Sequence, residues 1–312
     1  MMAEVFITYK NRFCFPDEIS GMGKDITLAD FSSLLDFLIA NREKTCLLTG
    51  NEPLLHPQLD ELLAIAHKKR IFIVLETSSL PDKKLKELMV KYKSALRWKI
   101  YHPSNYPEGE WDKLLKNFSA ITYENTLSVE LSFIIHNLSL DYSFFLPIFQ
   151  KYSFEGIHIG ILPKAFKGKL RATTEESEGL TTQLVQIAEK FSRRGIRVTL
   201  GCTIPPCLFS YAEFGFLARV GVLPYKCLPF PGFLSDLRVY HCRALIEEAE
   251  RDMSTFKDFS EIMNYFYDRY VKIQQECYFF EDCKQCLSRR VGVCLGACLA
   301  LKRAKMFDVR GV

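Results

Sequence analysis

Short apolar runs alternate with amphipathic stretches over the first two hundred residues of the chain. The apolar runs are rich in β-branched and aromatic residues, which is typical of buried strands. They predict strands over 4–9, 45–50, 71–77, 96–101, 127–135, 156–162 and 197–201. Between them, apolar residues recur at helical spacing, which predicts helices over 27–42, 59–69, 82–92, 110–118 and 180–194. Thr27, with Asp30 three residues on, is the expected N-cap of the first helix.

This alternation predicts right-handed βαβ units and a parallel sheet, and therefore an α/β fold. About six such repeats would form a curved, partly closed barrel, in which functional residues lie at the carboxyl ends of the strands. After residue 201 the chain is rich in Pro, Gly and aromatic residues, and one further helix is predicted over 259–275. We therefore expect a barrel domain over 1–200 and a smaller domain over 201–312.

The composition is that of an ordinary globular protein. The chain has 312 residues, of which 48% are hydrophobic and 25% charged, so it can bury a large core. The formal net charge of +4 is too small to predict nucleic-acid binding, and the basic stretches 164–171, 192–194 and 288–290 are expected to be solvated surface. Because the sequence shows neither a long apolar run nor a signal peptide, we expect a cytoplasmic protein that does not enter a membrane.

The eleven cysteines are unevenly distributed along the chain. Two lie early, and nine follow residue 200: Cys202, Cys207, Cys227, Cys242, Cys277, Cys283, Cys286, Cys294 and Cys298. In a reducing compartment, clustered cysteines indicate metal ligands before disulfides. The run Cys283-x2-Cys286-x7-Cys294-x3-Cys298 is a strong metal signal, because the first pair brings two thiolates onto one ion. Cys46 lies in an apolar strand and is expected to be a small core residue.

The stretch after the first predicted strand has the spacing of a known cluster motif but not its chemistry. Residues 10, 14 and 17 are Lys10, Cys14 and Asp17, and they match the positions of Cys-x3-Cys-x2-Cys. After the second and third strands the chain reads "TGNEPLLHP" and "ETSSL", and the fourth strand runs into "WKIYHPS". In this order of parts the chain resembles the radical S-adenosylmethionine (SAM) family with a SPASM domain, which modifies ribosomally made peptides.

The resemblance implies a partial (β/α)6 radical-SAM-like barrel over 1–200 and a small cysteine-rich SPASM-like domain over 201–312. In that family, the three cysteines after the first strand bind a [4Fe–4S] cluster whose open iron chelates SAM. A Gly-Gly-Glu-Pro turn after the second strand meets the methionine amino group. Gly50, Asn51, Glu52 and Pro53 keep most of that turn. Of the family's later Thr-Asn-Gly motif the chain keeps Thr77, followed by Ser78 and Ser79, and "WKIYHPS" stands in place of the Ser-x-Asp motif.

Physical chemistry makes the loss at the cluster positions decisive. Thiolates are the soft ligands that iron–sulfur clusters need. An ammonium such as that of Lys10 has no lone pair at neutral pH, and the carboxylate of Asp17 is a hard oxygen ligand. We therefore expect no radical-generating cluster and no SAM bound through it, and Cys14 is expected to be a leftover, half-buried thiol. Lys10 and Asp17 are hypothesised to pair with each other across the empty space.

Glu52 has two interpretations. It either binds an amino group, as the resemblance implies, or caps a neighbouring backbone in a turn that the barrel still needs; we favour the second. His56, His102 and His158 are expected to be satisfied by local hydrogen bonds rather than to bind a metal.

The resemblance also implies how the carboxyl-terminal cysteines are used. A first auxiliary [4Fe–4S] cluster would be held by Cys227, Cys242, Cys298 and either Cys202 or Cys207, of which we prefer Cys207. A second would use Cys283, Cys286 and Cys294, with its fourth ligand open and Cys277 as the best substitute for the family's last cysteine, which this chain lacks. The chain also departs from the family in the seven-residue spacer and in Leu237, which replaces a glycine. A zinc site made of four thiolates is the alternative, although nine cysteines fit two clusters better.

Together these patterns predict a pseudoenzyme. The resemblance implies that it is a companion of an active radical SAM/SPASM maturase and that it binds this enzyme, a precursor peptide or both. Two alternatives stay open: an enzyme with non-standard SAM or iron–sulfur chemistry, supported only by Glu52 and its turn, and a zinc-stapled binding module.

Overall fold

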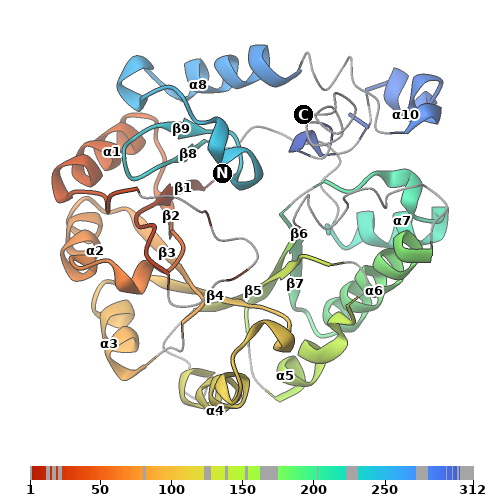
Figure 1. Ribbon diagram of the computed structural model, residues 1–312, viewed down its shortest axis with the longest axis horizontal. Coiled ribbons are helices and arrows are strands. Elements are labelled where there is room, and N and C mark those ends of the chain that lie inside the picture. Colours follow the sequence, from red (N-terminus) through yellow and green to blue (C-terminus); the bar gives the residue numbers. More distant parts are fainter. Residues whose placement is uncertain are drawn as a thin grey trace. The chain divides into compact units, whose positions relative to one another are not determined.

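A computed structural model of the protein describes residues 2–11, 15, 19, 23–79, 82–122, 128–137, 140–151, 154–161, 175–201, 203–222, 231–271, 280–292, 294–296, 298–300 and 302. Helices flank parallel strands throughout this part of the chain (Figure 1). The strands are β1 (Ala3–Phe6), β2 (Thr45–Thr49), β3 (Phe72–Thr77), β4 (Ala95–Ile100), β5 (Val129–Ile135), β6 (Gly156–Ile161), β7 (Arg197–Leu200), β8 (Gly232–Phe233) and β9 (Val239–Tyr240). The α-helices are α1 (Leu28–Ala40), α2 (Leu59–Lys68), α3 (Lys83–Lys91), α4 (Glu110–Thr122), α5 (Leu146–Lys151), α6 (Glu175–Ser192), α7 (Tyr211–Arg219), α8 (Phe259–Phe266) and α10 (Leu287–Arg290).

The chain divides into two compact units. The first comprises residues 1–131, 151–154 and 229–265, and the second comprises 132–150, 155–228 and 266–312. This division passes through β5. The domain boundary expected near residue 200 stays a prediction.

In the first unit, strands run in the order β4-β3-β2-β1-β8-β9. β1 to β4 pair in parallel, with Phe6 opposite Thr49 and Leu75 opposite Leu96. β8 extends this sheet in parallel beside β1, and β9 turns back antiparallel to β8. The described strands therefore form an open sheet that is parallel except for β9, and the predicted α/β partial barrel is confirmed. The β8–β9 pair was not predicted, because two-residue strands carry no readable periodicity.

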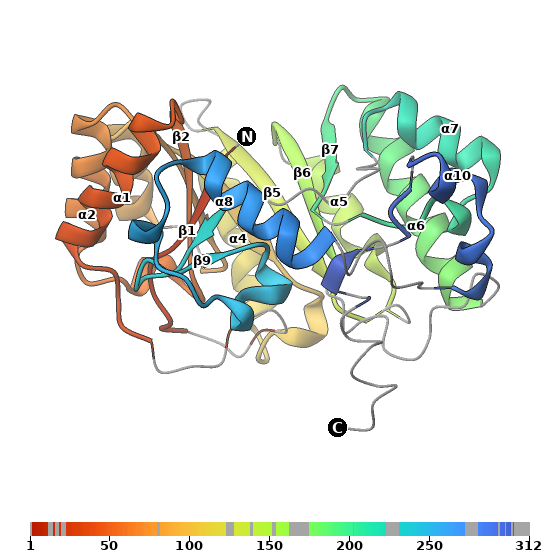
Figure 2. The ribbon, with the colours of Figure 1, turned by 90° about the horizontal axis from the view of Figure 1, so that it is seen from above.

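Helix α1 shows why the local sequence folds as it does. The Thr27 hydroxyl accepts a hydrogen bond from the backbone nitrogen of Asp30 at 3.0 Å, which confirms the predicted N-cap. Its buried residues, Phe31, Leu34, Leu35 and Leu38, recur at the spacing of one helical face. α1 and α2 lie side by side along the outer side of the strands (Figure 2).

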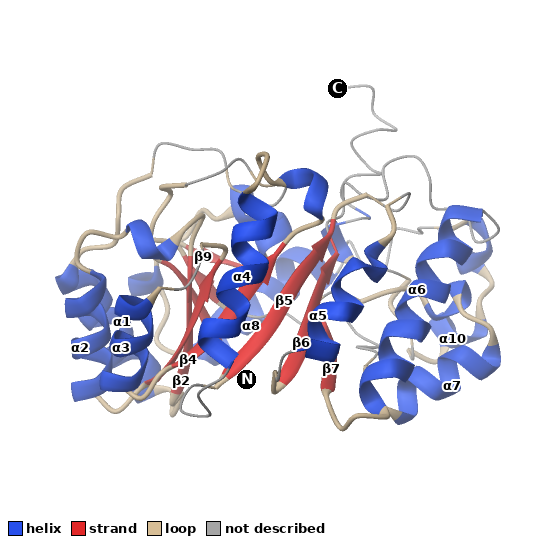
Figure 3. Cartoon of the chain, turned by 90° about the horizontal axis from the view of Figure 1, so that it is seen from below, coloured by secondary structure: helices blue, strands red, loops and turns tan. Residues whose placement is uncertain are grey.

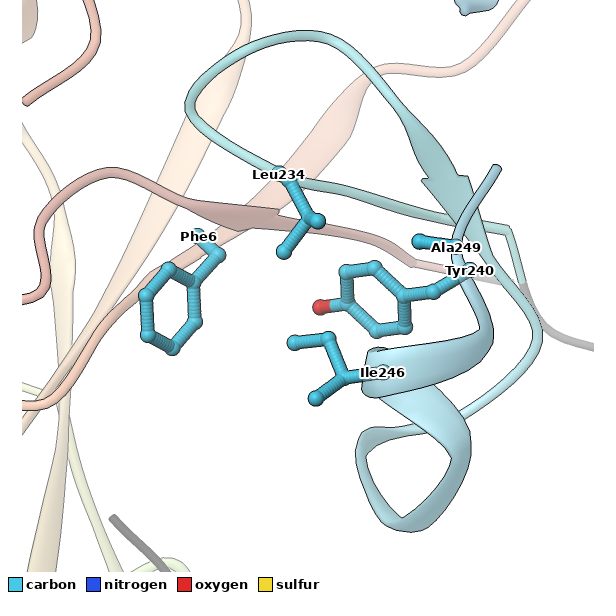
Figure 4. Packing of buried hydrophobic residues seen from close by; sticks show 5 residues of the cluster. All are labelled: Phe6, Leu234, Tyr240, Ile246 and Ala249. Carbon is cyan, nitrogen blue, oxygen red and sulfur yellow. The ribbon is translucent and has the colours of Figure 1, made fainter. Parts of the chain in front are cut away.

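A small apolar cluster fills the end of the first unit beside β8 and β9. The side chains of Leu234 and Ile246 point toward the Tyr240 ring from two sides, and Phe6 of β1 lies beyond the Tyr240 hydroxyl (Figure 4). Ala249 completes the cluster. The segment after residue 228 is thus joined to the first strand of the chain by a common core.

In the second unit, β6 and β7 pair in parallel, with Ile157 opposite Val198. α6 packs along β7, and α7 lies beside α6 (Figure 3). α7 was not predicted, although its capping box was readable in the sequence: Ser210 and Glu213 exchange hydrogen bonds with each other's backbone. Of the helix predicted over 259–275, Phe259–Phe266 is α-helical and Tyr267–Val271 forms a π-helical turn, and residues 272–275 lie outside the described residues.

Candidate functional site

The candidate site of the first unit lies at the carboxyl ends of β1, β2 and β3. Parallel pairing brings three segments to this edge: the loop that begins at Thr8, the turn Gly50–Pro53 and the residues Thr77–Ser79. Glycine at position 50 allows the first two segments to approach each other closely, because a Cβ atom there would lie only 2.6 Å from the backbone oxygen of Thr8. These are the segments that the sequence resemblance assigns to cluster and SAM binding.

Lys10, at the first cluster position, is engaged in an ion pair. Its ammonium lies 2.5 Å from Asp25 Oδ2, and the Thr8 hydroxyl donates to the other oxygen of that carboxylate at 2.6 Å. Burial alone would raise the pKa of Asp25, but these two hydrogen bonds and the Lys10 charge lower it. Asp25 was not singled out from the sequence. Cys14 and Asp17 lie outside the described residues, so the pairing of Lys10 with Asp17 stays a hypothesis, while the partner that the structure gives Lys10 is Asp25.

Glu52 is fully buried, and protein donors occupy both of its carboxylate oxygens. Oε1 accepts from the backbone nitrogen of Leu54 at 3.1 Å and from the Thr77 hydroxyl at 2.5 Å. Oε2 accepts from the nitrogen and the hydroxyl of Ser78, at 3.2 and 2.9 Å. Glu52 therefore caps its own turn and fastens it to the end of β3, an arrangement that supports its structural interpretation.

A network of charged and polar side chains connects β1, β2 and β3. Arg243, which contacts all three strands, was not singled out from the sequence. Arg243 hydrogen-bonds Glu4 of β1 through Nε, donates to the Thr49 hydroxyl of β2 at 2.9 Å, and lies 2.6 Å from Glu76 of β3 through Nη1. The Thr49 hydroxyl in turn donates to Glu76 at 3.2 Å, and Lys99 of β4 lies 3.9 Å from the same carboxylate. A readable signal was the presence of charged residues inside otherwise apolar strands.

This network fixes the charge of Glu76, which is only 3% exposed. Burial by itself raises the pKa of Glu76, but the positive charges of Arg243, Lys99 and Arg97 outweigh it and lower the pKa to about 2. Arg97 is itself paired with Glu130 at 2.7 Å. Glu76 is therefore a carboxylate at neutral pH, held by cations on both sides.

The three histidines singled out in the sequence all have local hydrogen-bond partners, as expected. His56 Nε2 lies 3.0 Å from the backbone oxygen of Ile26, and burial lowers its pKa. His102 Nδ1 lies 2.7 Å from the Ser104 hydroxyl, and His158 Nδ1 lies 3.1 Å from the Thr199 hydroxyl.

The predicted cysteine ligands lie partly in each unit. Cys242 directly precedes Arg243 in the first unit and is half-buried. Cys207, Cys283, Cys286, Cys294 and Cys298 belong to the second unit. Three predicted ligands, Cys202, Cys227 and Cys277, lie outside the described residues. Cys46 is fully buried in β2, which confirms it as a core residue, and burial raises its pKa far above the usual range.

Within the second unit, Cys207 shares its electrostatic environment with Cys283, Cys286 and Cys294, here called the knuckle cysteines. Although the residue is exposed, desolvation of its thiol and the neighbouring thiols of Cys283, Cys294 and Cys286 together raise the pKa of Cys207 to about 11. The backbone nitrogen of Gly296 donates to Cys294 Sγ at 3.2 Å, a contact typical of thiolates that hold metals. Among the described residues, no three His, Cys, Asp or Glu side chains stand in a geometry that would already enclose a metal ion.

Among the described residues, no helix combines the length and the hydrophobicity that crossing a bilayer requires.

Comparison with solved structures identifies the fold. The structure of Streptococcus suis SuiB bound to the precursor peptide SuiA matches with a TM-score of 0.63 and 13% sequence identity, over 96% of this chain and 70% of SuiB. Native anSMEcpe with bound AdoMet matches with a TM-score of 0.65 and 13% identity, over 96% of this chain and 89% of that one. The chain has the fold of SuiB and anSMEcpe. The predicted radical SAM/SPASM resemblance is therefore confirmed at the level of the fold.

A third structure, anSMEcpe with AdoMet and the Cp18Cys peptide, gives a TM-score of 0.66 at 14% identity, over 95% of this chain and 88% of that one. By sequence, no protein-family model and no curated protein matches the chain. The likeness to these structures is therefore one of fold, and the chemistry of this chain depends on its own residues.

Proposed function

We propose that this protein is a radical SAM/SPASM-like pseudoenzyme that binds a precursor peptide, an active maturase or both, without generating a radical itself. The observation that carries the proposal is the first cluster position, where the Lys10 ammonium is paired with Asp25. A cation held there by a carboxylate repels iron rather than binding it. The third position is an aspartate in the sequence, so one thiolate is left where three are needed.

The state of Glu52 supports the same proposal. In the family that the chain resembles, this glutamate meets the amino group of SAM. Here four donors from Leu54, Thr77 and Ser78 surround its two oxygens. An amino group could be accepted only if some of these hydrogen bonds were broken, at a cost of about 1–3 kcal/mol for each buried donor left unpaired. The catalytic alternative thereby loses its main support.

Peptide binding is proposed from the neighbours in structure. SuiB has been solved with the precursor peptide SuiA and anSMEcpe with the Cp18Cys peptide, and each aligns with nearly all of this chain. A chain that keeps this architecture without the cluster ligands retains the scaffold on which such peptides are held. We propose that positioning a peptide for a catalytic partner is what the scaffold has been kept for.

For the carboxyl-terminal third, over residues 201–312, we propose one or two [4Fe–4S] clusters, with zinc as the alternative. Cys283, Cys286 and Cys294 raise the pKa of Cys207, so these four cysteines share one electrostatic environment. As the resemblance implies, one centre would use Cys283, Cys286 and Cys294 with an open fourth ligand, for which Cys277 is the substitute. The other would use Cys227, Cys242 and Cys298 with Cys207 or Cys202. When bound, such a centre would act chiefly as folding energy for a small domain. Clustered thiols of this kind fit a reducing compartment, and we propose the cytoplasm.

Metal analysis of protein purified without oxygen tests where iron resides. Wild-type protein is expected to contain iron and sulfide. Cys14→Ser should retain all of it, because the loop thiol is not a ligand, whereas Cys283→Ser should lose the knuckle centre. If Cys14→Ser loses iron instead, the proposal is wrong. A colourless protein that contains zinc would leave the pseudoenzyme intact and replace the clusters by the zinc alternative.

Co-purification tests the partner. The full chain should retain either a precursor peptide or a radical SAM/SPASM maturase encoded beside it, and modification of the peptide should require the chain. A maturase that works equally well without this protein would contradict the companion role.

A further inference from the structure

The turn after β2 departs from the family pattern at one position with a visible structural consequence. Asn51 stands where the second glycine of the Gly-Gly-Glu-Pro turn is expected. It is buried, at 3% exposure, and its backbone nitrogen donates to the Thr8 oxygen at 3.1 Å. Its side chain reaches away from its own turn to the loop that follows β1, which is the loop of the degenerate cluster positions.

The Asn51 carboxamide holds both ends of that loop. Nδ2 donates to the backbone oxygen of Tyr9 at 2.9 Å and to that of Ile19 at 3.0 Å. Oδ1 accepts from the backbone nitrogen of Ile19 at 2.9 Å. One side chain therefore pairs with the N–H and the C=O of Ile19, as an adjoining strand would, while it also holds Tyr9. Residues 10–18 lie between these two anchors.

Lys10 and Phe15, two of the described residues between these anchors, make three further contacts. The backbone nitrogen of Glu52 donates to the Lys10 oxygen at 2.9 Å. Phe15 is 5% exposed, and its ring stacks on Tyr101 with 3.8 Å between the centroids and 10° between the planes. Tyr106 adds an edge-on contact to Phe15 at 5.4 Å.

We infer that Asn51 is the positioning residue that fixes this loop without metal, the task that an iron–sulfur cluster performs in the family the chain resembles. The inference deepens the proposed function and rests on it for the absence of a cluster. A glycine at position 51 has no side chain, so the polar groups of Tyr9 and Ile19 would lack these three hydrogen bonds. The change at position 51 thus compensates for the thiolates lost at positions 10 and 17, because it joins Tyr9 and Ile19, which lie on either side of these positions in the sequence.

Amide hydrogen exchange of the full chain tests this directly, read by mass spectrometry over residues 10–19 with and without an iron chelator. In wild-type protein the loop should be protected equally in both conditions. In Asn51→Ala, exchange of the Ile19 amide, which donates to Asn51 Oδ1, is expected to accelerate by about 100-fold, with helix α1 unaffected.

Asn41→Ala is the matched control, because Asn41 also makes two side-chain hydrogen bonds in the first unit, to Phe37 and from Phe259. It should leave the loop at the wild-type rate. Asn51→Asp keeps the side-chain volume and the acceptor for Ile19, but turns a carboxylate toward two carbonyl oxygens. It should also accelerate exchange, and it serves as the test if Asn51→Ala does not fold.

The outcomes separate the two proposals. Wild-type exchange rates in both Asn51 variants would overturn the inference while leaving the pseudoenzyme in place. Wild-type protection that disappears on chelation would mean that iron orders the loop, which contradicts the inference and the proposed function together.

Discussion

Replacing Arg243 by methionine should expose how strongly the charge network holds the first unit together. The substitution roughly preserves side-chain length and removes the cation that pairs with Glu4 and Glu76 and donates to Thr49. Two carboxylates on neighbouring parts of the sheet would then face each other with less compensation. Breaking a buried pair on one side generally costs about 3–5 kcal/mol, because the remaining charge is left unpaired.

The pKa of Glu76 gives an independent magnitude. Its value in the folded protein is about 2, against an ordinary value of 4.5. A difference of roughly 2.5 pKa units corresponds to about 3 kcal/mol of stability. Because the folded-state pKa is depressed, this contribution is fully present above pH 4.5 and is lost as the pH falls from there toward 2. Of the three cations that lower this pKa, Arg243 has the largest effect, and Lys99 and Arg97 remain in the variant. At neutral pH, Arg243→Met should therefore be destabilised by about 2–3 kcal/mol.

Urea unfolding followed by circular dichroism at pH 7, 5, 4 and 3 measures this contribution. The difference between wild type and Arg243→Met should be largest at pH 7 and should shrink below pH 4.5, as the carboxylates of the variant become protonated. Arg193→Met is the matched control: Arg193 pairs with Glu189 on the surface, so its loss should change little at any pH. A wild-type free energy of unfolding for Arg243→Met at pH 7, or a difference that does not vary with pH, would refute the reasoning.

Three further predictions concern the turn after β2 and the core. Glu52→Gln should lower the free energy of unfolding by about 2 kcal/mol, because the new amide group would face the Ser78 N–H donor without being able to accept from it. SAM affinity measured by calorimetry should not change. A loss of measurable SAM affinity with unaltered stability would contradict the capping role. Gly50→Ala should lower the free energy of unfolding by about 1–3 kcal/mol, because the new methyl group would clash with the Thr8 backbone oxygen. An unchanged melting temperature in thermal unfolding would contradict this close approach of β1 and β2. Cys46 should react with a maleimide only on unfolding, whereas Cys207 in metal-free protein should react in the native state, as mass spectrometry of the labelled peptides would reveal; rapid native labelling of Cys46 would contradict its burial.

Local features of the sequence predicted the scaffold well. The strands over 45–50, 71–77 and 156–162 match β2, β3 and β6 to within a residue at each end, because buried parallel strands read as continuous apolar runs. Thr27 and Cys46 stand where their local patterns predicted. Helix α7 was missed because the Pro and aromatic residues around it masked a short amphipathic pattern, although the Ser210–Glu213 capping box marked its start.

Contacts between distant parts of the chain could not be predicted in the same way. Arg243 meets Glu4 across 239 positions of sequence, and no local periodicity specifies which buried charges will pair. Asn51 was read as a departure from a glycine motif, and only the structure shows its amide on Tyr9 and Ile19. The same holds for Asp25 as the partner of Lys10. In each case the residue type was readable but its partner depended on the fold.

The central claim is that no radical-generating cluster forms where Lys10 pairs with Asp25. Its most direct test is an anaerobic assay of fully reconstituted wild-type protein with SAM and a strong reductant, followed by chromatography of the products. The account predicts no 5′-deoxyadenosine above the level of a protein-free control, even when the carboxyl-terminal thiols are loaded with iron. Formation of 5′-deoxyadenosine and methionine by the wild-type chain would contradict it.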